Sequence, residues 1–154
     1  MARADDASPR EDAIRLLARR EYARAELRER LAAKGHGPEA VEACLAALVE
    51  QGLQSDARFA ESFLRARVAR GQGPVRIRAE LSRRGIDEAT ARAAFDEAAG
   101  EVDWFALAAE TLARRFDGPG QAPRERARRE RFLAGRGFDF DQLRHALAHA
   151  WDDA

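Results

Sequence analysis

The sequence predicts an all-α protein made of three tandem three-helix repeats, with about nine short helices forming an elongated helical-repeat protein. The composition favours helix, because Ala, Leu, Arg and Glu dominate the 154 residues and β-branched residues are few. A Leu-x-x-basic-Gly pattern occurs three times and ends at Gly35, Gly85 and Gly137, at intervals of 50 and 52 residues. So regular an interval indicates repeated units that share apolar surface with their neighbours.

The first repeat is predicted over residues 10–52, after a disordered polar leader at residues 1–9. Its helices are expected at Glu11–Arg19, Arg24–Lys34 and Pro38–Gln51. In the second of these helices Leu27 and Leu31 lie one turn apart on one face, as a core-facing stripe requires. A Gly-Pro pair precedes the third helix, where proline at the first position loses no needed hydrogen bond.

The second repeat is predicted over residues 53–100. Ser55 is a suitable N-cap for its first helix, whose apolar side chains form one arc with helical spacing. The aromatic members of that arc, Phe59 and Phe63, are therefore expected in the core and not as stacking platforms for nucleic-acid bases. A Gly-x-Gly-Pro break then leads into a second helix at Pro74–Arg84, and a third begins at Asp87 and runs to about Ala99.

The third repeat is predicted over residues 101–154. Its first helix carries Trp104, Leu107, Leu112 and Phe116, and a loop with two Gly and two Pro follows at Asp117–Pro123. The next helix, Arg124–Arg136, is densely basic. The final helix, Asp139–Trp151, is expected to bury Leu143, Leu147 and Trp151, and Trp104 is also assigned to the core.

The formal net charge is zero at pH 7, but the charges are unevenly distributed. Basic residues outnumber acidic ones by eight to five between Arg10 and Lys34, nine to four between Arg58 and Arg92, and eight to three between Arg114 and Arg136. These basic stretches suit contact with phosphates or with an acidic protein face. For any single arginine, the alternative is a solvated helix face paired with a nearby glutamate.

No catalytic residue, metal site or cofactor site is predicted, so the chain is not expected to be an enzyme. His145 and His149 lie one turn apart but lack the glutamate of a zinc-protease helix, and no third ligand is nearby. Cys44 is the single cysteine and has no histidine base in its repeat apart from loop His36. No apolar run reaches the length of a membrane span, and no signal peptide is recognised, so a cytoplasmic monomer without membrane contact is expected.

The middle of the chain carries three motifs in a fixed order: Asp56-x-Arg-Phe-Ala, Gly71-x-Gly-Pro, and Arg76-Ile-x-x-Glu-Leu followed by Arg84-Gly-Ile. Together with flanking motifs in the first and third repeats, they resemble the RecX family of recombinase regulators. The resemblance covers residues 11–151 and departs from the family pattern at the Gly118-Pro119-Gly120 loop. It implies a partner, the RecA recombinase filament with its DNA. Family members lower RecA's strand-exchange, ATPase and co-protease activities, and so modulate DNA repair, recombination and the SOS response.

Exposed arginines are the candidate partner-binding residues, because guanidinium groups bind carboxylates and phosphates in bidentate fashion. The candidates are Arg58, Arg65, Arg76, Arg83, Arg24, Arg28, Arg128 and Arg131. Arg67, at the edge of the apolar arc, is predicted to form a structural ion pair instead. Two alternatives stay open: a DNA-binding protein that uses helix-turn-helix-like repeats with arginine strips on phosphates, and a general helical scaffold.

Overall fold

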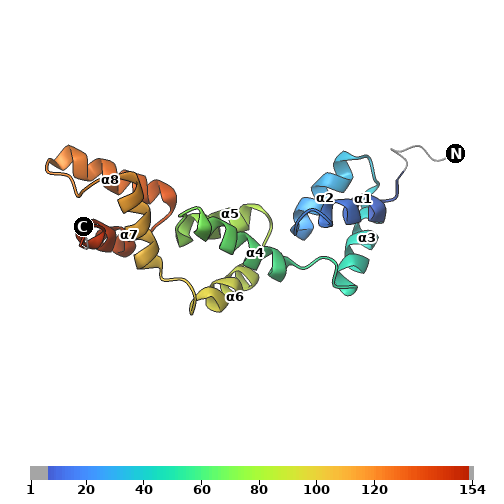
Figure 1. Cartoon of the computed structure of the whole chain (residues 1–154). Helices are drawn as coiled ribbons and strands as arrows, with labels where there is room; N and C mark the ends of the chain where they lie inside the picture. The colour runs from blue at the N-terminus through green and yellow to red at the C-terminus, as the bar shows by residue number, and fades with distance from the viewer. Residues whose placement is uncertain (1–6, 153–154) are drawn as a thin grey trace. The chain divides into compact units, whose positions relative to one another are not determined.

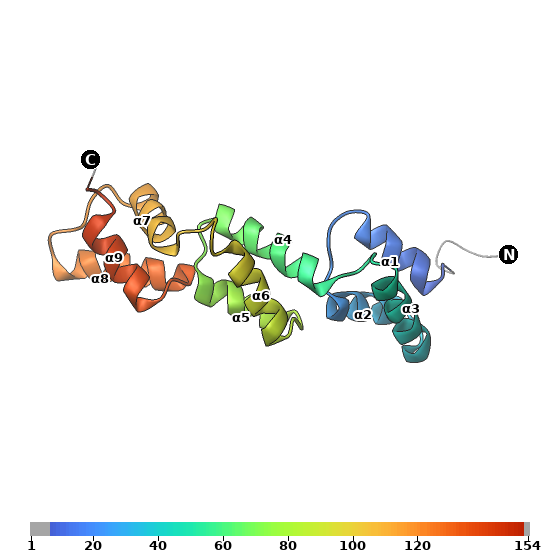
Figure 2. The ribbon, with the colours of Figure 1, turned by 90° about the horizontal axis from the view of Figure 1, so that it is seen from below.

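The computed structural model describes residues 7–152, and within that range it contains nine α-helices and no strand (Figure 1, Figure 2). The helices are α1 (Pro9–Leu17), α2 (Arg24–Ala33), α3 (Pro38–Glu50), α4 (Asp56–Ala69), α5 (Pro74–Arg83), α6 (Glu88–Ala98), α7 (Trp104–Arg115), α8 (Pro123–Arg136) and α9 (Phe140–His149). The prediction of an all-α protein built from three-helix repeats is therefore confirmed.

Helix ends follow the local capping signals of the sequence. Gly37 is the N-cap of α3, and the Asp139 carboxylate accepts a hydrogen bond from the Gln142 backbone N–H at 2.8 Å at the start of α9. Asp87 accepts from the Thr90 N–H at 2.7 Å, and this bond holds the pKa of the Asp87 carboxyl below its usual value. Gly137, with φ +95°, ends α8 in the left-handed conformation that glycine adopts without strain.

The start of the first helix differs from the prediction. Ser8 is the N-cap of α1, since its hydroxyl accepts a hydrogen bond from the Glu11 N–H at 3.1 Å, and Pro9 is the first helical residue. The helix therefore begins two residues earlier than expected, inside the stretch assigned to the leader. Residues 1–6 of that predicted leader lie outside the described range.

The chain divides into two compact units. In the described residues the first comprises 7–62 with 81–93, and the second comprises 63–80 with 94–152. The core of the first unit includes buried side chains from α1, α2 and α3, among them Ala13, Leu27, Leu31, Val41, Leu45 and Leu48. Phe59, on α4, is 3% exposed, which confirms its core assignment.

The second unit has its core cluster between α7, α8 and α9. Its buried members are Ala108, Leu112, Phe116, Leu133, Phe138, Leu143 and Ala146. Leu147, Trp104 and Trp151 are only half-buried, so their assignment to the buried core was too strong. Trp151 donates its indole N–H to the Phe116 carbonyl at 3.1 Å. Trp104 packs against Phe95, with ring centroids 5.8 Å apart. Both tryptophan side chains therefore lie at the edge of the core.

Two backbone segments of the second unit lie in direct contact. The Gly73 N–H donates to the Arg136 carbonyl at 2.7 Å, and the Val75 N–H donates to the Gly137 carbonyl at 2.9 Å. A Cβ added at Gly137 would lie 2.2 Å from the Arg76 Cβ, and one at Gly73 would lie 2.4 Å from the Gly137 carbonyl oxygen. Glycine is required at both positions because a side chain would occupy the space of the facing backbone.

Candidate partner-binding surface

Whether a predicted arginine is available to a partner depends on whether its guanidinium group already donates hydrogen bonds to acceptors within the fold. Arg28, on α2, is committed to Glu42 on α3, with Nε–Oε2 and Nη2–Oε1 distances of 2.6 and 3.1 Å. This bidentate bond lowers the pKa of the Glu42 carboxyl and raises that of Arg28. A guanidinium held in this way joins two helices of the first unit and is not a free donor for a partner.

Arg58 is also committed, although the sequence suggested an exposed row with Arg65. Its guanidinium donates to the Gly52 and Leu53 carbonyls at 2.7 and 3.2 Å and to the Glu21 carboxylate at 3.0 Å. The two carbonyls follow the end of α3, where backbone acceptors lack helical partners. Arg58 therefore holds the turn that follows α3, and Arg65 is the member of the pair that has no hydrogen-bond or ion-pair partner among the described residues.

The same difference separates Arg76 and Arg83: one is paired within the fold and the other is not. Arg76 donates to Glu80 at 3.0 Å and to the Gly135 carbonyl at 3.3 Å. Glu80 also meets Arg67 at 3.4 Å, with both side chains less than one-fifth exposed, and the Arg67 guanidinium lies 4.5 Å from the Phe63 ring centroid. The predicted structural ion pair of Arg67 is confirmed. Arg83 is exposed, and the described residues offer it no hydrogen-bond or ion-pair partner.

Arg24 is an intermediate case. Its backbone N–H donates to the Asp56 carboxylate at 2.9 Å, while its Nε is buried and makes no hydrogen bond to any described group. Half-buried Arg24 thus contributes mainly through its backbone, which ties the start of α2 to the start of α4 within the first unit.

The clearest exposed row lies on α8. Arg124, Arg128 and Arg131 follow one another at i, i+4 and i+7, so they share a face of this helix. All three are exposed, and none forms an ion pair with a described carboxylate; Arg128 lies 5.8 Å from the Phe116 ring centroid. Sequence reasoning selected Arg128 and Arg131 but missed Arg124. Its spacing from the other two was the signal that could have identified it.

The neighbouring arginines of α8 donate hydrogen bonds to backbone carbonyls of the same unit. Arg129 donates to the Gly118 and Glu125 carbonyls at 2.7 and 2.9 Å, and Arg126 donates to the Gln121 carbonyl at 3.1 Å. Arg136 bonds the Arg70 carbonyl. The loop that departs from the family pattern, around Gly118, is thus held against α8 by arginine side chains.

No described group of side chains forms a metal site. His145 and His149 have ring centroids 4.8 Å apart, but His149 bonds Asp152 at 2.7 Å, and no set of three potential ligands occurs in residues 7–152. Half-buried Cys44 has a pKa raised by its apolar surroundings, the opposite of an activated thiolate. None of the described helices combines the length and apolarity that crossing a membrane requires.

Comparison with known proteins assigns the chain to a family. Models of the first, second and third three-helix domains of RecX match residues 10–48, 55–94 and 101–147, respectively. The chain belongs to the RecX family. The structural resemblance extends to solved members: the crystal structure of RecX from Lactobacillus salivarius aligns with a TM-score of 0.76 at 22% identity, covering 92% of this chain and 94% of that chain.

Relatives with curated names agree with this assignment. The "Regulatory protein RecX" of Chromohalobacter salexigens is 61% identical over 149 residues, with 96% of each chain covered. The protein of the same name from Halorhodospira halophila is 48% identical over 145 residues, covering 94% of this chain and 89% of that one. These RecX relatives support a regulatory role for the chain.

Proposed function

We propose that this RecX protein binds RecA recombinase filaments on DNA in the cytoplasm and lowers their strand-exchange, ATPase and co-protease activities. The observation that carries the proposal is the match of all three RecX domain models, in order, along nearly the whole chain. The unpaired arginines add physical support, because each can form charge-assisted hydrogen bonds with a partner without first breaking an internal one. In this proposal the chain acts by binding and performs no chemistry on its partner.

The proposed contact surface consists of Arg124 and those predicted arginines that have no hydrogen-bond or ion-pair partner among the described residues. Arg65 and Arg83 lie in the second repeat, and the α8 row lies in the third. Arg58, Arg76 and Arg28 are removed from the contact set because their guanidinium groups already satisfy carboxylates or carbonyls. Replacing these paired arginines would weaken the fold itself, so a loss of inhibition in such variants would not identify a contact.

The test is to measure ATP hydrolysis by RecA on single-stranded DNA while the purified chain is added. We expect inhibition at substoichiometric ratios of chain to RecA. The triple variant Arg124→Gln, Arg128→Gln, Arg131→Gln should require several-fold more protein for the same inhibition and should keep the parental melting temperature, because surface substitutions change stability by less than about 0.5 kcal/mol each. A wild-type chain that leaves hydrolysis unchanged at stoichiometric ratios would refute the proposed function.

A second candidate function is direct DNA binding through the α8 row. The i, i+4, i+7 spacing of its arginines suits the phosphates along one groove edge. Titration against bare and RecA-coated DNA across salt separates the two functions. A DNA-binding protein would bind bare DNA tightly, with a log–log salt slope of about −0.9 per neutralised phosphate of a duplex, or about −0.7 for a single strand. A filament regulator would bind coated DNA more tightly than bare DNA.

A further inference from the structure

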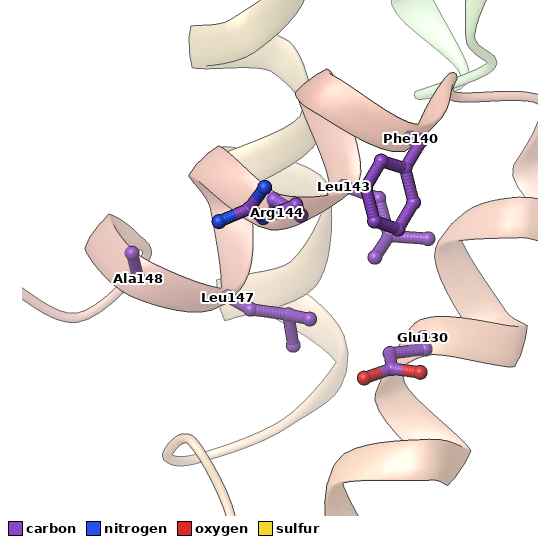
Figure 3. A pocket seen from close by; sticks show the side chains of 6 residues that line it. All are labelled: Glu130, Phe140, Leu143, Arg144, Leu147 and Ala148. Carbon is purple, nitrogen blue, oxygen red and sulfur yellow. The ribbon is translucent and has the colours of Figure 1, made fainter.

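A shallow groove of about 450 Å³ lies between α8 and α9 in the second unit (Figure 3). Its apolar lining comes from α9, with Phe140, Leu143 and Leu147, while Glu130 of α8 lies across the gap from Leu147. Arg144 and Ala148 complete the lining. None of these six residues was among the predicted contact residues, and the arginine surface described above does not include them.

Phe140 is the most unusual member of the groove, because its side chain is 70% exposed at the first position of α9. The backbone around it is fixed by a capping box: Asp139 accepts from the Gln142 N–H at 2.8 Å, and the Gln142 side chain accepts from the Asp139 N–H at 2.9 Å. Behind it, Leu143 packs into the core cluster of the unit. A large aromatic side chain is thus held at the surface on a rigid support, as in protein-binding hot spots.

The two charged side chains that line the groove, Arg144 and Glu130, have opposite signs. Exposed Arg144 forms no ion pair with a described carboxylate, and its guanidinium lies 5.6 Å from the Phe140 ring centroid. Glu130, on the opposite rim, is also exposed and lacks a cationic partner among the described residues. A bound segment can therefore pair a carboxylate with Arg144 without competing against an existing ion pair.

We propose that this groove binds an amphipathic helix of the protein partner that places a carboxylate against Arg144 and a basic side chain against Glu130. One large apolar side chain of that helix packs on Phe140, Leu143 and Leu147, and a carboxylate one turn away pairs with Arg144. Nucleic acid is the poorer occupant, because phosphates gain nothing from an apolar wall and are repelled by Glu130. The proposal rests on the proposed function, since the partner is taken to be a protein of the RecA filament.

The test uses the full chain and RecA-coated single-stranded DNA, with binding measured by fluorescence anisotropy. Phe140→Ser and Arg144→Glu should each weaken binding to the coated strand by about tenfold or more, the size expected of hot-spot contacts. Matched controls are Phe105→Ser, an exposed aromatic (42%) on α7 that lies outside the groove lining, and Arg114→Glu, an exposed arginine on the same helix. Both controls should bind within about twofold of wild type, because residues outside a hot spot contribute little to affinity.

The outcomes distinguish the groove from the function on which it depends. Wild type that does not bind the coated strand would overturn both proposals. Wild type that binds, with Phe140→Ser and Arg144→Glu unchanged, would overturn the groove alone. An equal loss of affinity for bare DNA in these variants would assign the groove to nucleic acid and contradict the proposal. The proposal would also be contradicted if wild type sediments as a dimer that Phe140→Ser dissociates, because the groove would then bind a second copy of the chain. Loss confined to the coated strand, with circular dichroism unchanged, supports it.

Discussion

The three glycines of the Leu-x-x-basic-Gly pattern permit a controlled measurement of what a close backbone contact contributes to stability. All three have left-handed φ, at +93° for Gly35, +83° for Gly85 and +95° for Gly137, so alanine incurs a similar conformational cost at each, about 1–2 kcal/mol. Their surroundings differ. An added Cβ meets nothing within 4 Å at Gly35, the Ala25 Cβ at 2.6 Å at Gly85, and the Arg76 Cβ at 2.2 Å with its backbone N at 2.7 Å at Gly137.

The expected order of destabilisation is therefore Gly35→Ala, then Gly85→Ala, then Gly137→Ala. At Gly35 only the conformational cost applies. At Gly137 the facing group is helix backbone, which cannot rotate away, and overpacking of this kind adds about 1–3 kcal/mol. For a chain of this length each kcal/mol lowers the melting temperature by roughly 2–4 °C, so Gly137→Ala should melt several degrees below Gly35→Ala.

Thermal melts followed by far-ultraviolet circular dichroism would measure the series, with one substitution in each variant and identical buffer. Tryptophan fluorescence provides a second readout, because Trp104 and Trp151 both belong to the unit that contains Gly137. Equal melting temperatures for Gly35→Ala and Gly137→Ala would refute the reasoning. In that case the positive φ alone would account for glycine at these positions, and the contact with Arg76 would contribute nothing.

Other predictions follow from individual contacts. Phe59→Ala should lower the free energy of unfolding by about 3–5 kcal/mol, measured in urea, because the side chain is 3% exposed; a variant that unfolds like wild type would contradict this. Arg58→Gln should cost about 1 kcal/mol because the carbonyls after α3 lose their donor, whereas Arg65→Gln should leave the melting temperature unchanged. The stability of the chain should also fall at low pH because of the buried carboxylate of Asp12. A hydrogen bond from His36 at 2.7 Å holds the pKa of this carboxyl below its usual value. Its contribution to stability is present above the unfolded value of about 4 and is lost as the pH falls below it, so melts of Asp12→Asn should vary less between pH 5 and pH 2.

Local signals account for most of what could be predicted from sequence. Helix ends depend on residues within a few positions of one another, so the Gly37 cap, the Asp139 cap and the glycine at position 137 could be recognised directly. The periodic spacing of Leu27, Leu31 and Phe59 likewise identified side chains that the structure buries. One local signal was missed, since Ser8 with Pro9 at the start of α1 was assigned to the leader.

The contact surface could not be predicted in the same way. Helical spacing showed which arginines are able to face outward, but it carried no information about acceptors from other helices. Glu21, which binds Arg58, lies 37 positions away, and Glu42, which binds Arg28, lies 14 away. The sequence by itself therefore determined the helices, their caps and the apolar faces, because these depend on neighbours along the chain. Only the tertiary structure decided which arginines stay unpaired and where Phe140 lies exposed, because ion pairs and grooves depend on which helices pack together.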